Sequence, residues 1–360
     1  MNISIDGLRG VALILVMLFH AGAPFSQAGW LGVDLFFALS GFLITTLLIR
    51  EYDKCGEISF KKFWLRRFLR LMPVYVFYIL LITIAVLSSP AHELHTVGGF
   101  SPAQYLVGLW TYTFNFIPLA GIWAHQAFTG HLWSLSVEEQ FYLFWPLTMY
   151  WMLGKRHIVA MVWTVVLGLV LCNLSFYDGH PPHLMIYTRG ISMIIGCAVA
   201  ITAYYRSGAS VFGKIVYSVT FTKYLLLIVA ILFGVISYFV VAEHATASMM
   251  IPLWIPFFSL ATSLLIANFW YAESTALADF FRYSYLSWLG RISYGGYIYH
   301  MAVHQFVWYR LLVGIQAWNP YLKFGVRLLS FVALTVLLAW LSYRYFEKPI
   351  LDVKNRYRSV

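Results

Sequence analysis

The sequence predicts an all-α, polytopic membrane protein of about ten transmembrane helices. Hydrophobic residues make up 61% of the 360 residues and charged residues only 11%, whereas an ordinary soluble domain carries roughly 25% charged residues. A soluble chain of this size must expose a large area to water, so the composition excludes a soluble globular protein and a disordered chain. Apolar segments of the length needed to cross a bilayer recur along the chain, and Lys and Arg gather in alternate connections between them.

Ten apolar segments have roughly the 20 residues that a helix needs to span a bilayer. One further segment, 103–119, is short for a span and contains Asn115 and Pro118. The ten predicted spans lie near residues 7–23, 31–49, 71–88, 131–153, 158–175, 184–205, 224–242, 249–271, 289–312 and 323–345.

The basic residues decide how segment 103–119 is placed, because cytoplasmic loops attract Lys and Arg. If the N-terminus is inside and 103–119 does not cross, 20 of the 24 Lys and Arg residues fall on the inner side, and the outer loop 89–130 has none. Letting 103–119 cross would turn every later basic loop outward. We therefore expect ten spans, two cytoplasmic termini, and a re-entrant or interfacial helix near 103–119.

We expect one membrane domain over residues 1–360, with its first apolar run retained because no signal-peptide cleavage pattern precedes it. The net charge of +10 favours lipid phosphates and anionic cofactors as partners over nucleic acid, because the basic residues lie between apolar segments. The three cysteines are far apart, which argues against a disulfide framework or a metal site.

Arg9 and His20 lie on one face of the first predicted span. Eleven residues make about three helical turns, which separates the two side chains by about 16 Å along the axis. Asp6 falls near the same stripe. A phosphate-bearing donor held by Arg9 could extend an arm to His20, and a neutral imidazole is the usual general base for a hydroxyl that attacks an acyl carbonyl. The alternative is that His20 packs in the core and Arg9 is a snorkelling anchor.

Three arginines form a cluster before the third span. Arg66 and Arg70 are four residues apart and share a helix face, with Arg67 beside them. Clustered Arg suits bidentate phosphate binding. A cytoplasmic amphipathic helix attracted to anionic lipid has the same pattern, and the two roles can coexist.

Asp34 lies in the outer part of the second span, near the expected depth of His20. An aspartate there can orient a histidine and stabilise its imidazolium, while the alternative is an interfacial aspartate that faces water. In the same span, Gly32 and Gly41 favour close packing of helices.

The fourth span opens with acidic and amide side chains. Glu138, Glu139 and Gln140 enter the membrane segment together with aromatic residues, a combination that suits a sugar acceptor. The alternative is that one of the two glutamates is there only because the helix dipole favours acidic side chains near the N-terminus of a helix.

Two further polar residues fall in later spans. Arg189 is a candidate for binding an anionic or polar acceptor, because ionisable groups within spans are costly and usually functional. His300 lies inside the ninth span, where a hydrogen-bonded core histidine is an equally good interpretation of it.

Taken in order, these segments resemble the integral membrane acyltransferase-3 family, the O-acyltransferases of bacterial surface glycans. Each match alone is short, but together they run nearly the whole length of the chain. The matching segments are Asp6 to Gly10 followed by His20, residues 32–37 and 39–42, 66–73, 133–142, 293–300 and 347–349.

The resemblance implies transfer of an acyl group, usually acetyl from acetyl-CoA in the cytoplasm, to a carbohydrate hydroxyl at the other face of the bacterial cytoplasmic (inner) membrane. It implies that Arg9 and His20 are essential, that the arginine cluster binds the nucleotide end of CoA, and that Asp34 and Glu138 are functional. We expect no metal. The acceptor would be a glycan or lipid-linked saccharide, with O-antigen among the possibilities. We expect this chain to lack the C-terminal esterase-like domain that some members carry.

Two other functions remain open. A transporter or flippase of a lipid-linked sugar would also have about ten spans and buried charges, although it would more often show inverted repeats, which the sequence lacks. The same type of enzyme could also use a different acyl group, such as succinyl.

Overall fold

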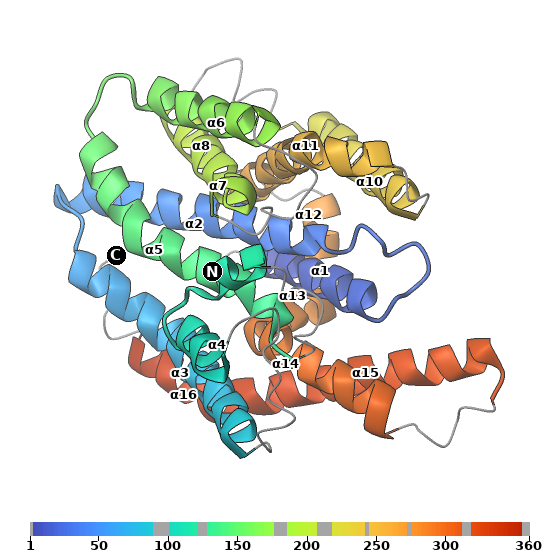
Figure 1. Cartoon of the computed structure of the whole chain (residues 1–360). Coiled ribbons are helices and arrows are strands. Elements are labelled where there is room, and N and C mark those ends of the chain that lie inside the picture. Colours follow the sequence, from blue (N-terminus) through green and yellow to red (C-terminus); the bar gives the residue numbers. More distant parts are fainter. Residues whose placement is uncertain are drawn as a thin grey trace. The chain divides into compact units, whose positions relative to one another are not determined.

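The computed structural model describes residues 3–88, 101–120, 128–175, 186–206, 218–241, 245–271, 276–311 and 318–354, and this part of the chain is helical with no strand (Figure 1). Within the predicted outer loop 89–130, residues 89–100 and 121–127 lie outside the described residues. The described chain divides into two compact units, and each is described here by itself.

The first unit comprises residues 1–58 and 141–291. Its helices are α1 (Ile3–His20), α2 (Leu31–Cys55), α6 (Ile158–Ser175), α7 (Ile186–Arg189), α8 (Ile191–Arg206), α10 (Val219–Val241), α11 (Ala245–Tyr271), α12 (Ala276–Arg282) and α13 (Ser284–Arg291). Helix α5 (Trp133–Met152) begins in the second unit and ends in the first.

The second unit comprises residues 59–140 and 292–360. Its helices are α3 (Phe60–Ser88), α4 (Pro102–Trp110), η1 (Phe114–Ala120), η2 (Gly130–Leu132), α14 (Ser293–Phe306), η4 (Val307–Leu311), α15 (Pro320–Ser342), η6 (Tyr343–Glu347) and α16 (Lys348–Lys354).

The all-α membrane fold is confirmed. Seven segments among the described residues are helical, long and apolar enough to cross a bilayer: Ile3–His20, Leu31–Cys55, Phe60–Ser88, Ile158–Ser175, Thr220–Tyr238, Trp254–Tyr271 and Pro320–Asp352. The other three predicted spans form helices that are more polar or interrupted. Helix α5 contains Glu138 and Glu139, span 184–205 breaks at Gly190, and span 289–312 breaks at Ile292.

The third span and segment 103–119 also differ from the prediction. The third span helix begins at Phe60 instead of near residue 71, so the arginine cluster is its first part and not a separate segment. The long apolar stems of Lys and Arg allow basic residues to continue a helix beyond the apolar run. Segment 103–119 divides into α4, of nine residues, and η1, and neither is long enough to cross a bilayer.

Helix α2 is the centre of the first unit and packs against α1, α8 and α11, with α10 beside α11 (Figure 1). The predicted role of its glycines in close packing is confirmed. A Cβ on Gly41 would overlap the carbonyl oxygen of Met193 in α8, and one on Gly32 would overlap the carbonyl oxygen of Ala12 in α1. The helices therefore meet backbone to backbone at these points.

Helix α1 is held in the same way on its other side. A Cβ on Gly7 would overlap the carbonyl oxygen of Phe281, and a Cβ on Gly290 would overlap that of Asp6. The first turns of α1 therefore lie directly against α12 and α13, which fixes the helix that carries Arg9 and His20.

In the second unit, α3 packs against α14, α16 and the short helix α4. Helix α4 begins with a capping box in which the Ser101 side chain accepts from the Gln104 amide and the Gln104 side chain accepts from the Ser101 amide. The Tyr75 hydroxyl of α3 donates to the carbonyl of Leu109 at 2.7 Å, which anchors the end of α4.

The Gly41 contact gives a direct test of this packing. We expect Gly41→Ala to lower the thermal unfolding temperature of the detergent-solubilised protein, because overpacking costs about 1–3 kcal/mol. The matched control is Gly168→Ala in α6, where a Cβ meets nothing within 4 Å, so the temperature should hold or rise. Equal melting temperatures for the two variants would refute the backbone contact between α2 and α8.

Candidate functional site

The first unit contains the predicted pair on α1. The guanidinium of Arg9 donates to the Asp6 carboxylate at 2.8 Å, and the two side chains are 14% and 5% exposed. The predicted shared stripe of Asp6 and Arg9 is thus confirmed. Asp6 holds the cation at the start of the helix, and the Arg9 side chain keeps a small solvent-exposed fraction.

His20 is the last residue of α1, whereas the predicted span 7–23 places it within the helix. The chain turns directly afterwards through Gly22, which has φ +66°. The His20 Nδ1 lies 2.9 Å from the carbonyl oxygen of Val16. A carbonyl can only accept, so Nδ1 carries the proton and a neutral ring has its lone pair at Nε2, the form that a general base requires.

Asp34 and Arg189 were predicted separately, and the structure brings them together. The Arg189 guanidinium lies 3.1 Å from the Asp34 carboxylate, and both side chains are buried. Ser192 donates to the other carboxylate oxygen at 2.8 Å, and Ser259 donates to Ser192 at 2.8 Å. Arg189 also lies over the ring of Trp30, 4.8 Å from its centroid.

This network links α2, α7, α8 and α11 through one buried charge pair. Its cation neutralises Asp34, which would be very costly to bury alone. The roles predicted for Asp34 beside His20, and for Arg189 in acceptor binding, stay predictions.

In the second unit, the cluster on α3 faces acids. Arg67 interacts electrostatically with Glu139, which also lies near Glu138, and Arg70 interacts with Glu347. Glu347 is buried and accepts a hydrogen bond from Ser342 at 3.1 Å. The predicted role of Arg66, Arg67 and Arg70 in binding CoA, and that of Glu138 in catalysis, stay predictions.

The amide of Gln140 joins α5 to the segment that follows α4. It donates to the Tyr112 carbonyl at 2.8 Å and to the side-chain oxygen of Asn115 at 2.9 Å. Tyr112 has φ 54°, a strained value for a residue with a side chain, and its ring stacks on Tyr75 at 4.3 Å. Burial raises the pKa of the Tyr112 hydroxyl, with smaller effects from Glu139 and Tyr75, so it stays protonated.

His300 lies in a buried cluster of the second unit. Its Nδ1 is 2.5 Å from the carbonyl oxygen of Tyr297, and its ring is 4.7 Å from that of His131. The hydroxyls of Ser134 and Tyr297 are 2.6 Å apart. The burial of His300 agrees with its interpretation as a hydrogen-bonded core histidine. The predicted role of His300 in acceptor binding stays a prediction.

Several polar residues of these clusters were not singled out from the sequence. Glu347 was noted only as part of a matching segment, although an acid directly after an apolar span is a signal of a buried partner. A Cβ on Gly295 would come 2.9 Å from the Glu347 carboxylate, so this glycine leaves room for the carboxylate.

Across the described residues, no group of three or more His, Cys, Asp or Glu could hold a metal ion.

Comparisons with known proteins agree on one kind of protein. A family model described as an acyltransferase domain, Acyl_transf_3, matches residues 2–344. The peptidoglycan O-acetyltransferase OatA of Listeria monocytogenes is 29% identical over 363 residues, which cover 96% of this chain and 55% of the relative. YrhL of Bacillus subtilis, named as a candidate peptidoglycan O-acetyltransferase, is 29% identical over 358 residues, or 96% of this chain and 54% of YrhL.

A candidate O-acetyltransferase of Staphylococcus aureus is 28% identical over 373 residues, which cover 96% of this chain and 56% of the relative. The chain therefore spans about half the length of the curated relatives that it matches. No solved structure is significantly similar to it.

The charge pair in the first unit gives a prediction. Arg189→Gln should destabilise the protein by about 3–5 kcal/mol, because it leaves Asp34 buried without its cation. The double variant Asp34→Asn/Arg189→Gln should recover much of this loss when thermal unfolding is compared for wild type, the two single variants and the double variant.

The matched control is Arg282→Gln, which removes an exposed ion pair with Asp279 and should cost no more than about 1 kcal/mol. Strictly additive effects of the Asp34 and Arg189 substitutions would show that the two side chains do not stabilise one another.

Proposed function

Because the chain belongs to the acyltransferase-3 family, we propose that it is a membrane O-acyltransferase that moves an acetyl group from acetyl-CoA to a hydroxyl of a glycan. The observation that carries the proposal is the arrangement of α1. One continuous helix bears an accessible cation near its start and, eleven residues later, a histidine whose Nδ1 donates to a backbone carbonyl.

Arg9 and His20 contact different parts of the acyl donor, acetyl-CoA. Arg9 binds a phosphate of CoA, and the extended pantetheine arm bridges the roughly 16 Å along the axis to His20. Asp6 orients the Arg9 guanidinium by accepting a hydrogen bond from one of its N–H groups.

The proposed reaction is acyl transfer with His20 as general base. The acceptor hydroxyl oxygen attacks the thioester carbonyl carbon, and Nε2 takes the hydroxyl proton. The tetrahedral intermediate collapses with cleavage of the carbon–sulfur bond, and the CoA thiolate leaves and takes the proton from the imidazolium. The products are an O-acetyl ester and CoA, and His20 returns to its neutral form.

The acceptor and the membrane complete the proposal. The names of the relatives favour peptidoglycan over O-antigen as the glycan. The distribution of Lys and Arg supports the cytoplasmic membrane, with both termini in the cytoplasm and the acceptor at the opposite face.

His20→Ala gives the first test. Purified protein, incubated with acetyl-CoA labelled in the acetyl group, should transfer the label to an added glycan acceptor, and the variant should lose this transfer by at least about 100-fold. His157→Ala, which removes an exposed histidine at the start of α6, is the matched control and should keep full activity.

A His20→Ala protein that inserts into the membrane and transfers at the wild-type rate would end the proposal. A transporter would neither hydrolyse nor transfer the label in any variant. Parallel reactions with succinyl-CoA would show whether the donor is restricted to acetyl.

Arg9→Ala tests donor binding separately. Loss of a charge-assisted contact with phosphate should weaken the affinity for CoA by about 10–100-fold, with little change in affinity for the glycan. Arg291→Ala, which removes another cation of the first unit, serves as the control. Unchanged CoA affinity in Arg9→Ala, measured by calorimetry, would remove the role assigned to Arg9.

A further inference from the structure

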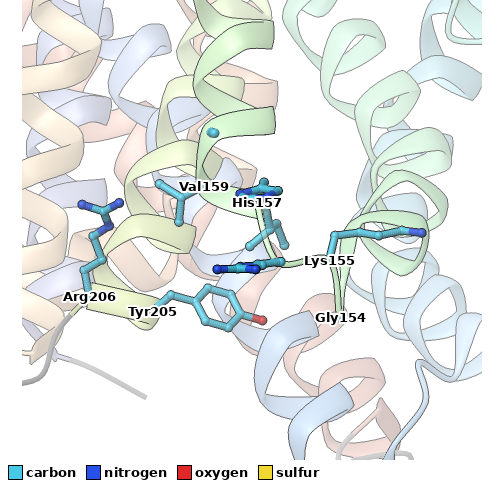
Figure 2. A pocket seen from close by; sticks show the side chains of 9 residues that line it. Gly154, Lys155, His157, Val159, Tyr205 and Arg206 are labelled. Carbon is cyan, nitrogen blue, oxygen red and sulfur yellow. The ribbon is translucent and has the colours of Figure 1, made fainter.

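A cavity of about 430 Å³ lies in the first unit, where α5 is followed by α6 and where α8 ends (Figure 2). It is lined by residues 154–160 together with Tyr205 and Arg206. None of these residues takes part in the acyl-transfer reaction proposed above, so the cavity needs an account of its own.

The lining of the cavity is strongly cationic. It includes Lys155, Arg156 and Arg206, and the side chains of His157 and Tyr205 add hydrogen-bond donors. In Figure 2, Lys155 and Arg206 extend in different directions, with His157 and Tyr205 between them. Two guanidinium groups within one cavity favour an oxyanion, because each can donate two parallel hydrogen bonds.

The backbone at the start of α6 also contributes to the positive electrostatic potential of the cavity. Val159 and Ala160 lie in the first turn of this 18-residue helix, where amide N–H groups have no acceptor within the helix. Both residues line the cavity. The positive end of the helix dipole and these amides therefore act in the same direction as the basic side chains.

One nearby carboxylate opposes this charge. Asp53 interacts electrostatically with Tyr205, and it accepts a hydrogen bond from the hydroxyl of Tyr204. The described lining contains Lys155, Arg156 and Arg206 and no Asp or Glu, so the lining itself is positive.

The cavity lies at the end of apolar helices. The candidate span Ile158–Ser175 begins in its lining, and the apolar helix Ile191–Arg206 ends in it. Tyr150, Trp151 and Tyr205 are 52%, 62% and 45% exposed, and aromatic side chains of this kind gather at the boundary between lipid and water. Exposed leucines on α6, Leu167 and Leu171, offer an apolar surface beyond this boundary.

We propose that this cavity binds the phosphate group of an anionic glycerophospholipid. The cations and the amides of α6 hold the headgroup phosphate, and the acyl chains lie along the exposed apolar face of α6. A soluble phosphate ester has the same recognition chemistry, but it would make no use of the aromatic and apolar surface next to the cavity.

The test counts the lipids that the full chain retains. The protein is purified from mixed vesicles of phosphatidylglycerol and phosphatidylcholine, and the lipids bound to it are identified by native mass spectrometry. We expect wild type to prefer phosphatidylglycerol, and Arg156→Gln/Arg206→Gln to bind it about 25-fold more weakly, since each cation near an anionic lipid contributes roughly fivefold.

The matched control removes the same charge elsewhere. Lys223→Gln/Lys348→Gln replaces two exposed lysines outside the cavity and should keep the preference for phosphatidylglycerol. Arg156→Lys/Arg206→Lys keeps the charge but loses the guanidinium forks, so it should show a smaller loss. This variant tests the site even if the glutamine variant does not fold.

Two results would overturn the proposal. One is equal retention of phosphatidylglycerol by wild type and by both cavity variants. The other is binding of inorganic phosphate or adenosine 3′,5′-bisphosphate that depends on Arg156 and Arg206 while phosphatidylglycerol is retained no better than phosphatidylcholine, because the cavity would then hold a soluble phosphate.

Discussion

The need to neutralise charge inside apolar surroundings governs how this chain is built. Only 11% of its residues are charged, and within the described residues several charges on the helices of both units lie beside opposite charges. Asp6 pairs with Arg9, Asp34 pairs with Arg189, and Arg67 and Arg70 face Glu139 and Glu347. A buried charge without a partner costs several kcal/mol, so the pair of Asp34 and Arg189 fixes α2 against α7. The pairs differ in access. Asp34 and Arg189 are fully enclosed, which suits a structural role, whereas Arg9 stays partly accessible, which suits a ligand.

Close backbone packing is the second constraint, and it depends on glycine. Without Gly32 and Gly41, α2 could not approach α1 and α8 closely enough for Asp34 to reach Ser192. Gly7 and Gly290 bring the first turns of α1 against α12 and α13 and thereby fix the direction of the helix from Arg9 to His20. The site proposed here is therefore rigid at its base, because the helix bearing the donor-binding cation and the base is held on two sides.

The all-α membrane class, the shared stripe of Asp6 and Arg9 and the packing role of Gly32 and Gly41 were predictable, because they follow from apolar length, helical periodicity and the space that a Cβ needs. The number of spans was not, since seven of the ten predicted spans are long and apolar enough in the described residues to cross a bilayer. The start of α3 at Phe60 was not predictable, because the apolar stems of Lys and Arg side chains let basic residues continue a helix beyond the apolar run that marks the span. The ion pair between Asp34 and Arg189 could not be predicted from the sequence either. The two residues are 155 positions apart, and only the tertiary fold brings α2 and α7 together. The contact of Gln140 with the Tyr112 carbonyl was not predictable for the same reason, because the two residues are 28 positions apart. Glu347 is bound by Ser342, only five residues before it, but no helical periodicity marks this pair.

The central claim is that α1 carries both ends of the acyl donor site. Its most direct test is a structure of the protein in lipid nanodiscs with a non-hydrolysable analogue of acetyl-CoA. The account predicts a phosphate of the analogue in contact with Arg9 and the acyl carbonyl carbon within about 3–5 Å of the His20 ring, close enough for an acceptor hydroxyl to lie between them. An analogue bound with its acyl group remote from His20, or with none of its phosphates in contact with Arg9, would contradict the account.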